Sequence, residues 1–367
     1  MAAAVLAGCA SVPRRAPQTA SDLAESSIPA IPDARMWLDA DLKSWSAWQS
    51  ARRASPAVTD ETHMLAISSG SDKGAFSAGY LVGCSAAGRR PAFDLVTGVS
   101  AGALVAPFAF LGSPYDRDRA PNFTGTATSD VFRVRLLGLL FGKASFADSG
   151  PLRTLIARYV NAAFVEAIAV EHRKGRRLLI LTTNLDAARG MVWDVGAIAA
   201  SGSPARVDLV RSILLASASI PGLFAPVMID SKSRERDLSE MHADGGIVQS
   251  ILFPPLVPKF ADADSGKTLL VLYNGKWPIE HQVVRRSVGA VVGRAFATLT
   301  AEADRNTLAA YRADHADTSI RFAAIDPNFS TKSKRLFERR YMTALFAYGR
   351  SKAIKEQCQS DDATARR

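Results

Sequence analysis

The feature that most constrains the fold is the pentapeptide Gly98-Val99-Ser100-Ala101-Gly102, which lies between two apolar segments. Phe93–Thr97 has the composition of a buried strand, and Ala103–Leu111 is compatible with a helix. A serine on so tight a turn needs neighbours without side chains, because the turn requires unusual backbone angles and the helix must approach the strand closely. The sequence therefore predicts an elbow of strand, sharp turn and helix, typical of α/β proteins.

The same region contains 21 residues without a charge, Leu95–Tyr115, which is long enough to cross a membrane. Glycines and prolines interrupt it, and the strand, turn and buried helix account for its hydrophobicity. We therefore predict no transmembrane helix here.

A second glycine-containing loop, Ser69-Gly70-Ser71-Asp72-Lys73-Gly74, follows the apolar segment Met64–Ser68 and precedes a helix-compatible stretch that reaches about Cys84. A loop between a strand and a helix leaves backbone N–H groups pointing outward at the helix N-terminus, where they can hold an anion. Taken alone the signal is weak, because many such turns use glycine for its backbone freedom.

A serine nucleophile at position 100 needs a base, usually a histidine and sometimes a carboxylate. In the order of an ordinary Ser-acid-His triad, His281 and His315 are the candidates. A stronger feature follows a polar segment, Ser231–Glu240, which we expect to be a loop. There Asp244-Gly245-Gly246 contains the only aspartate in the chain that precedes a glycine. Such a sequence is either a plain turn or the position of a catalytic carboxylate.

Taken in order, these motifs resemble the patatin-like phospholipase family. Two intermediate segments also look familial, Leu181–Asp186 and Ala216–Pro226, and the resemblance extends from about Met64 to Asn274. It implies a three-layer α/β/α fold with a mainly parallel central sheet. It also implies a Ser-Asp dyad, with Ser100 as the nucleophile and Asp244 as its base.

The resemblance further implies that the glycine-containing loop forms the oxyanion hole, with N–H groups offered by Gly70 and Ser71. Lys73 and Gly74 fit the family pattern, whereas Ser69 and Ser71 stand where the family commonly has glycine. A serine N–H still donates where its backbone angles are allowed. Lys73 is then expected to position the loop or to screen a lipid phosphate, unless it is a plain surface lysine.

The implied activity is hydrolysis of (phospho)lipid esters through an acyl-enzyme, with no metal and no cofactor. Two alternatives stay open. One is a carboxylesterase with a Ser-His-Asp triad, which would need His281 or His315. The other is a non-catalytic lipoprotein of the same fold that binds lipid or a partner protein, motivated by Ser69 and Ser71.

Composition and charge restrict the classes of protein further. Hydrophobic residues make up 48% of the 367 residues and charged residues 22%, which excludes a disordered chain. The net charge of +10 is concentrated beyond His281, where the net charge is +7. No nucleic-acid-binding motif accompanies it, so we expect solvated helical faces and no nucleic-acid partner.

Three scattered cysteines, Cys9, Cys84 and Cys358, form no disulfide framework and no zinc motif, although export would permit Cys84 and Cys358 to pair.

The N-terminus is the basis for the expected location. Leu6-Ala7-Gly8-Cys9 resembles the bacterial lipobox, in which the cysteine is acylated and becomes the mature N-terminus. The resemblance implies a lipid anchor on a membrane of the bacterial cell envelope, and Ala10 favours the outer membrane. The alternative is an alanine-rich N-terminus that contains a cysteine by chance.

Four segments are expected. Residues 1–33 would be a signal with a flexible tether, and 34–58 an amphipathic helix whose tryptophans pack on the main domain or lie at a membrane interface. Residues 59–280 would be the catalytic domain, and 281–367 a basic, mainly helical extension packed on the same domain.

Overall fold

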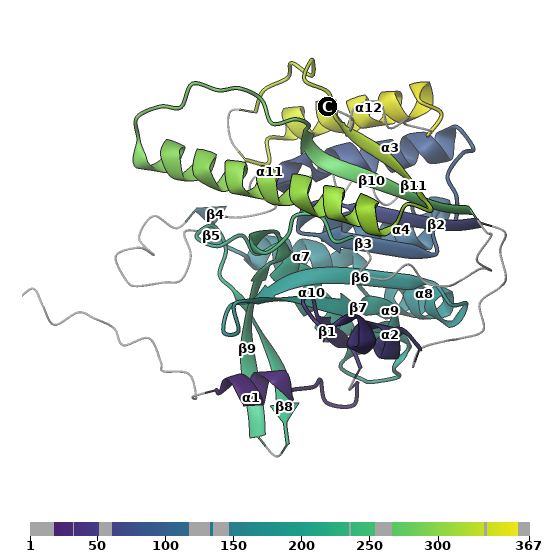
Figure 1. Ribbon diagram of the computed structural model, residues 1–367, viewed down its shortest axis with the longest axis vertical. Helices are drawn as coiled ribbons and strands as arrows, with labels where there is room; N and C mark the ends of the chain where they lie inside the picture. Colours follow the sequence, from purple (N-terminus) through teal and green to yellow (C-terminus); the bar gives the residue numbers. More distant parts are fainter. Residues whose placement is uncertain are drawn as a thin grey trace, which may run out of the picture.

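The structure is a computed structural model that describes residues 18–31, 33–50, 61–116, 133–134, 147–234, 236–253, 266–333 and 336–358. The expected lipobox, with Cys9, lies outside the described residues. Figure 1 shows a central sheet with helices on both faces and a long helix, α11, crossing the front.

The central sheet has nine strands, and its main path runs β1-β7-β6-β3-β2-β10-β11. Neighbours along β6-β3-β2-β10-β11 are parallel, whereas β7 is antiparallel to β6 and to β1. A hairpin, β8 and β9, joins the sheet where β9 pairs with β6, and a separate small sheet pairs β4 with β5. The strand bounds are β1 Arg35–Trp37, β2 Glu61–Ile67, β3 Leu95–Val99, β4 Arg133–Val134, β5 Ala147–Asp148, β6 Arg177–Asn184, β7 Arg189–Asp194, β8 Val227–Ser233, β9 Arg236–Asp244, β10 Gly266–Lys276 and β11 Thr318–Ile325.

Helices cover the two faces of the sheet because side chains alternate along each strand. In β2, Leu65 and Ile67 join one apolar cluster, and Met64 and Ala66 join the other. The larger cluster contains residues of α3, α4, α7, α8, α9, α10 and α12, and the smaller one contains residues of α2 and α11. The helix bounds are α1 Ala20–Ala24, α2 Leu42–Ser50, α3 Gly74–Ala86, α4 Ala101–Leu111, α7 Gly150–Tyr159, α8 Ala162–Arg173, α9 Val195–Ala200, α10 Arg206–Ser217, α11 Val288–Asp314 and α12 Arg339–Lys355.

The expected three-layer α/β/α fold with a mainly parallel sheet is therefore confirmed. Around the pentapeptide, β3 ends at Val99 and α4 begins at Ala101, as the elbow pattern predicts. Around the second loop, β2 ends at Ile67 and α3 begins at Gly74. Within the described part of the chain, no helix is both long and apolar enough to cross a membrane.

The prediction of a flexible tether over residues 1–33 is wrong for its described part, residues 18–31 and 33. Helix α1 begins with a capping box in which Thr19 and Asp22 satisfy each other's backbone N–H groups. Leu23, Ile28 and Ile31 are buried. These three apolar residues pack the segment onto the protein, but their spacing in the sequence matches neither a helix nor a strand.

The prediction of one helix over residues 34–58 also needs correction. Residues 35–37 form β1, which pairs with β7, and the helix begins only at Leu42. Edge pairing with β7 overrides the helical spacing of the apolar residues. Trp45 and Trp48 are buried in the smaller apolar cluster, so the packing interpretation of this helix is confirmed.

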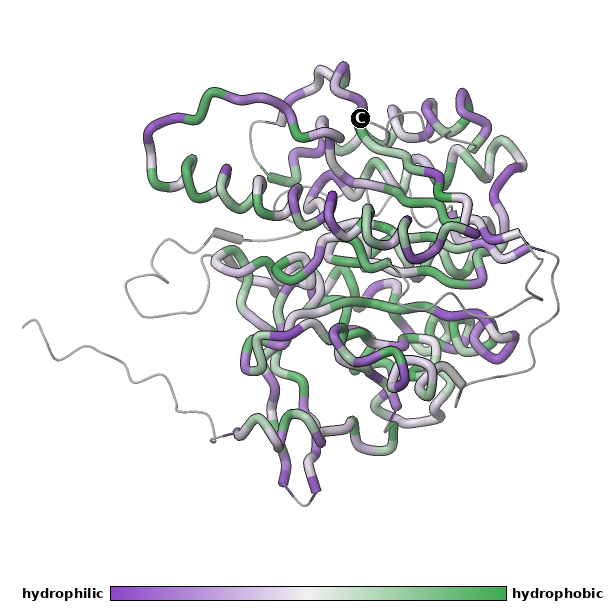
Figure 2. The backbone as a smooth tube through the Cα atoms, viewed as in Figure 1, coloured by the Kyte–Doolittle hydropathy of each residue, from purple (hydrophilic) through white to green (hydrophobic). Residues whose placement is uncertain are grey.

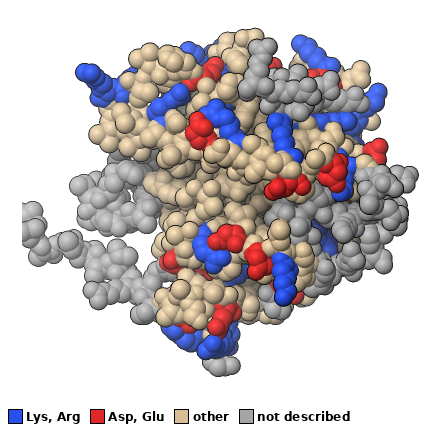
Figure 3. Space-filling view, in the orientation of Figure 1, with Lys and Arg blue, Asp and Glu red and all other residues tan. Residues whose placement is uncertain are grey.

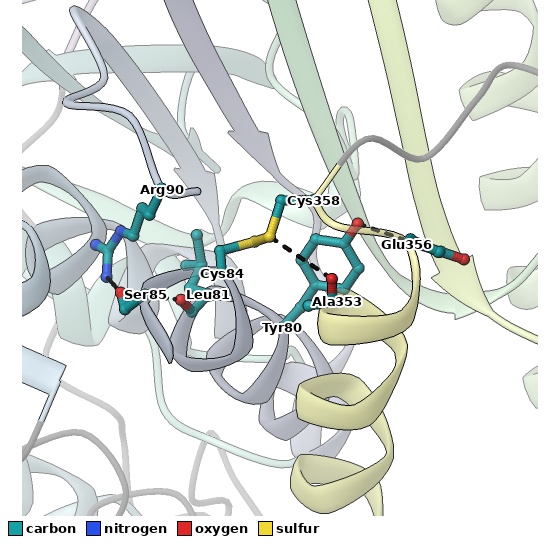
Figure 4. Close-up of a disulfide and its surroundings, with 8 residues drawn as sticks. All are labelled: Tyr80, Leu81, Cys84, Ser85, Arg90, Ala353, Glu356 and Cys358. Atoms are coloured by element: carbon teal, nitrogen blue, oxygen red, sulfur yellow. Dashed lines mark hydrogen bonds between the residues drawn. A yellow bond between two sulfur atoms is a disulfide. The ribbon is translucent and has the colours of Figure 1, made fainter. Parts of the chain in front are cut away.

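The C-terminal region, residues 281–367, is an integral part of the sheet, because it supplies the edge strand β11. Helix α12 packs closely on α3: a Cβ atom built on Gly79 would lie 2.1 Å from the carbonyl oxygen of Phe346. A disulfide between Cys84 and Cys358, with their Cα atoms 5.5 Å apart, joins the ends of these two helices (Figure 4). The extension is thus tied to the helix that follows the glycine-containing loop.

The described residues of Ser231–Glu240, expected to be a polar loop, instead form the end of β8 and the start of β9, and Figure 2 shows that these strand ends are hydrophilic. Its buried face carries apolar side chains, Val227, Ile229 and Leu238, and also the carboxylate of a buried ion pair. Arg35 donates to both carboxylate oxygens of Glu240, at 2.9 and 2.7 Å, and Ser231 also donates to Glu240. Because the buried Glu240 has these hydrogen-bond partners, a charged residue occupies a buried strand position, and the sequence lacks the regular alternation of apolar and polar residues that would predict a strand.

Candidate active site

Ser100 and Asp244 meet because two strands run toward each other along one edge of β6. β3 lies parallel to β6 and ends with Val99 opposite Leu181. β9 is antiparallel to β6 and ends with Asp244 opposite Thr182, the next residue along β6. Ser100, which follows Val99, and Asp244, the last residue of β9, therefore lie next to each other at the edge of β6.

Ser100 is held in a strained conformation at the start of α4. Its φ of 55° and ψ of −120° lie in a region that L-residues rarely adopt. The flanking glycines are required by packing: a Cβ atom on Gly98 would lie 2.6 Å from the carbonyl oxygen of Gly102, and one on Gly102 would lie 2.3 Å from that of Ile67. The tight turn thus lifts the serine off the strand, as the pentapeptide predicts.

The Ser100 hydroxyl donates a hydrogen bond of 2.6 Å to Oδ2 of Asp244. The two residues are 3% and 5% exposed, so the bond lies in a nearly dry environment. Such burial strengthens the interaction and also makes an ionised carboxylate costly.

Asp244 is fixed on every side by polar contacts. Its Oδ1 accepts the N–H of Gly246 at 2.7 Å, its own N–H donates to the carbonyl of Ser219, and its carbonyl accepts the Thr183 hydroxyl. Burial raises the pKa of Asp244 to about 7, although the hydrogen bonds from Ser100 and Gly246 oppose that rise. A carboxylate with such a pKa is a far better base near neutral pH than an exposed aspartate.

The two histidines that a triad would use lie elsewhere. His281 is exposed at the edge of a cavity described below, and His315 stacks on Tyr311 with ring centroids 4.1 Å apart. The hydrogen bonds found for the Ser100 side chain among the described residues include Asp244 and no histidine. Among the described residues, the Ser100 hydroxyl thus contacts a carboxylate, and neither of these histidines has a hydrogen bond to it.

The glycine-containing loop approaches the site between β2 and α3. Gly70 has a φ of 154°, and a Cβ atom there would lie 2.4 Å from the Cβ atom of Asn274, so only glycine fits. Ser71 adopts a φ of 56°, the left-handed conformation that glycine would take without cost. In the described part of the chain, the N–H groups of Gly70 and Ser71 donate no hydrogen bond. Gly74 contacts Ala101, directly after the serine, because a Cβ atom there would lie 2.9 Å from the Cβ atom of Ala101.

A cavity of about 1430 Å³ is lined in part by this loop. Ser69, Gly70 and the exposed Lys73 line one end, and residues of α11 line another. Ser100 and Asp244 are not among its lining residues. The cavity therefore reaches the loop that would bind an oxyanion rather than the serine itself.

Two supporting residues were not identified from the sequence. The hydroxyl of Ser217, at the end of α10, accepts the N–H of Ser100 at 2.9 Å and donates to the carbonyl of Leu181 at 2.7 Å. The Asn274 amide donates to the carbonyl of Ser68 and accepts the N–H of Ser77, which fixes the loop from both ends. Ser217 belongs to one of the familial segments, which was the only sequence signal available for it.

The described residues contain no group of three or more His, Cys, Asp or Glu side chains arranged to hold a metal ion.

The model of the family described as "Patatin-like phospholipase" matches residues 65–257, more than half of the chain. The chain belongs to the patatin-like phospholipase family. Membership in this family supports lipid hydrolysis as the activity. A comparison with curated proteins finds no match.

Among solved structures, the chain is similar to VipD from Legionella pneumophila, with 10% identity, a TM-score of 0.43, and coverage of 82% of this chain and 67% of VipD. It is also similar to the type III effector protein ExoU, with 14% identity and a TM-score of 0.31. That match covers 82% of this chain and 54% of ExoU, so the chain spans about half the length of ExoU.

Proposed function

We propose that this protein is a serine acyl hydrolase that cleaves ester bonds of lipids, phospholipids among them, through a dyad of Ser100 and Asp244. The observation that carries the proposal is the 2.6 Å hydrogen bond from the Ser100 hydroxyl to the buried Asp244 carboxylate, at the elbow of a patatin-like fold. The nucleophile, its base and the strained turn then follow the family pattern residue by residue.

In the first step, Ser100 Oγ attacks the ester carbonyl carbon while its proton passes to Asp244 Oδ2. The carbonyl oxygen becomes an oxyanion that the N–H groups of Gly70 and Ser71 stabilise. When the tetrahedral intermediate collapses, the ester C–O bond breaks, and the leaving alcohol takes the proton from Asp244. In the second step, water attacks the acyl-enzyme, loses a proton to Asp244, and the carboxylic acid leaves as Ser100 recovers its proton.

Ser71 is consistent with this role even though a serine replaces glycine there. Its backbone already has the positive φ that the loop requires. That conformation lowers the stability of the folded protein by about 1–2 kcal/mol for a non-glycine residue, but it does not change the position of the Ser71 N–H group. Lys73 lines the cavity and is placed to attract the phosphate of a phospholipid.

The decisive experiment treats the wild type, Ser100→Ala and Asp244→Ala with a fluorophosphonate probe and then assays a phospholipid and a short soluble ester. Labelling and both activities should be lost in Ser100→Ala and strongly reduced in Asp244→Ala. Ser113→Ala, an exposed serine just beyond the other end of α4, is the matched control and should label like the wild type. Labelling that survives Ser100→Ala would end the assignment.

The two alternatives give different results in the same assays. A triad enzyme would lose activity in His281→Ala or His315→Ala, whereas the dyad predicts near wild-type rates. A non-catalytic lipid-binding protein would show neither labelling nor turnover in the wild type.

The proposed location is the bacterial cell envelope, most simply the outer membrane, through acyl chains on Cys9. The lipobox-like sequence supports it. Incorporation of labelled palmitate should require Cys9 and should be unaffected by Cys84→Ser. Equal labelling of Cys9→Ser and the wild type would contradict the anchor.

A further inference from the structure

The first half of α11, together with the segment that leads into it, forms an exposed arm. We define the α11 arm as residues 281–301. Nearly every residue before Ala301 is exposed or half-buried, whereas Ala301, Asp304, Leu308 and Tyr311 are buried. In Figure 1 the left end of α11 and the loop above it extend beyond the body of the protein. Within the described part of the chain, the helix is thus anchored by its second half, and its first half is mostly exposed.

The α11 arm concentrates exposed apolar side chains. Of the fourteen exposed large hydrophobic residues in the described chain, six lie on this arm. Leu299 is 71% exposed and Val288 81%. The six are Val283, Val288, Val291, Val292, Phe296 and Leu299. Scattered apolar residues need no explanation, but a cluster on one element marks an interaction surface.

The five of these residues that lie within the helix share one face. Val288, Val291, Val292, Phe296 and Leu299 recur at intervals of three, four and seven, which places them in a single stripe. At about 100° per residue, the buried anchors Asp304, Leu308 and Tyr311 lie roughly 120–180° around the helix from Leu299. The apolar stripe therefore points away from the body to which the rest of α11 is packed.

The charge of the α11 arm has one sign. From His281 to Ala301 the sequence contains Arg285, Arg286 and Arg294 and no aspartate or glutamate. In Figure 3 the left end of α11 is mostly tan, with blue side chains beyond it. Within these bounds the apolar stripe is accompanied only by arginines, as in helices that lie in the interface of an anionic membrane, and the acidic residues Glu280 and Glu302 lie directly outside them.

The α11 arm is also joined to the proposed active site. Phe296, Ala297 and Thr300 line the cavity whose other end is the loop at Ser69 and Gly70. A lipid drawn from a surface beneath the arm would enter this cavity next to the proposed oxyanion hole.

A hydrogen-bonded route runs in parallel with the cavity. Asp304, the first buried polar anchor of α11, accepts the Ser250 hydroxyl at 2.7 and 2.6 Å. The carbonyl of Ser250 in turn accepts the N–H of Ser69 at 2.8 Å. The helix that carries the apolar stripe is thus two hydrogen bonds away from the loop.

We propose that the α11 arm docks onto the surface of an anionic phospholipid membrane, with Val288, Val292 and Leu299 inserted and Arg285 and Arg286 on the headgroups. The choice of a lipid surface, rather than a second copy of the chain, rests on this one-signed charge and in part on the proposed function. The docking itself does not require Ser100 to react.

The test uses the full chain, expressed without export so that Cys9 carries no acyl group. Sedimentation with vesicles of phosphatidylcholine, alone or with about 30% phosphatidylglycerol, measures binding. Val292→Ser/Leu299→Ser should weaken binding to the anionic vesicles about tenfold or more, because the stripe loses apolar area. Arg285→Gln/Arg286→Gln should weaken it by roughly 25-fold, about fivefold for each arginine, and should reduce its dependence on salt.

Val170→Ser, which removes an exposed valine from α8, is the matched control and should bind like the wild type. Ser100→Ala should also bind like the wild type, which separates failure of docking from failure of the proposed chemistry. The arm variants should keep wild-type activity on a short soluble ester and lose activity on vesicles.

Three results would overturn the proposal. The first is vesicle binding that is equal in the arm variants and the wild type. The second is binding that does not depend on phosphatidylglycerol. The third is a monomer–dimer equilibrium, measured by analytical ultracentrifugation, that the arm variants abolish while vesicle binding persists, which would assign the stripe to a second copy of the chain.

Discussion

Replacing Asp244 by asparagine should destroy activity and yet stabilise the protein at neutral pH. The substitution keeps the size of the side chain and removes the charge. An amide oxygen can still accept the N–H of Gly246, and the amide nitrogen can donate to a reoriented Ser100 hydroxyl. What is lost is the proposed base, and kcat/KM should fall by roughly 10²- to 10⁴-fold.

The gain in stability follows from the raised pKa of Asp244. Burial places it at about 7 in the folded protein, against 3.8 for the ordinary side chain. Below the ordinary value the carboxyl is protonated in both states and costs nothing. As the pH rises from about 4 to 7, the unfolded state releases the proton first, so the folded state loses about 1.4 kcal/mol of stability per pH unit. Above pH 7 the loss is complete, on the order of 4 kcal/mol.

Urea denaturation of both proteins at pH 5 and pH 8 measures this difference. The free energy of unfolding of Asp244→Asn minus that of the wild type should grow by roughly 3 kcal/mol between these pH values. Constant contributions, such as altered hydrogen bonds, cancel in that comparison, and other carboxyl groups titrate alike in both proteins. A difference that stays constant with pH would refute the reasoning.

Three further predictions concern the same site and its scaffold. On a short soluble ester, kcat/KM should fall about tenfold per pH unit below about pH 7, since Asp244 must be ionised to accept the proton; a plateau that persists to pH 5 would contradict this. Ser217→Ala leaves the buried N–H of Ser100 unpaired, so it should destabilise the protein by about 1–3 kcal/mol and lower kcat. Ser219→Ala removes a hydroxyl that donates to the carbonyl of Leu215 in α10, and it should leave kcat unchanged; equal losses in both variants would argue against a positioning role. Removing the Cys84–Cys358 disulfide by double substitution to serine should cost about 2–5 kcal/mol in urea denaturation under non-reducing conditions, and the difference from the wild type should vanish with reductant.

The sequence predicts the elements around Ser100 well because their signals are local. The elbow consists of five consecutive residues, and the steric contacts that require Gly98 involve the helix that directly follows it, whereas Gly102 is required by its contact with Ile67 at the end of β2. The loop at Gly70 is recognisable for the same reason. The three-layer fold class was implied by the family resemblance, and the local pattern of a strand that leads into a packed helix agrees with it.

Sequence reasoning fails where order depends on distant partners. Residues 18–33 have the composition of a tether, but Ser27 bridges Lys232 and Ser26 donates to Glu240 in the hairpin. Residues 231–240 have the composition of a loop because their buried face is satisfied by Arg35, some 200 positions earlier. Neither segment shows a regular pattern in its own sequence, because each is stabilised by hydrogen bonds to the other.

The position of Asp244 depends both on a local sequence signal and on contacts with distant segments. Its Asp-Gly-Gly context marks it as unusual, but a plain turn would have the same sequence, and only the family resemblance favoured a catalytic role. What brings it to Ser100 is a mismatch in strand length. β3 covers β6 from Arg177 to Leu181 and then turns away, which leaves the edge at Thr182–Asn184 without a partner.

An unpaired strand edge in the interior would leave buried N–H and C=O groups without hydrogen bonds. β9 fills that gap, antiparallel, and its last paired residue is Asp244. The strand pairing that completes the edge of β6 therefore also places the Asp244 carboxylate beside the Ser100 hydroxyl. This explains how a residue 144 positions away in the sequence reaches hydrogen-bonding distance of the elbow without a dedicated loop. It also implies that substitutions which shift the register of β9 on β6 by one residue would turn the carboxylate to the opposite face of the sheet and remove the base while leaving the fold class intact.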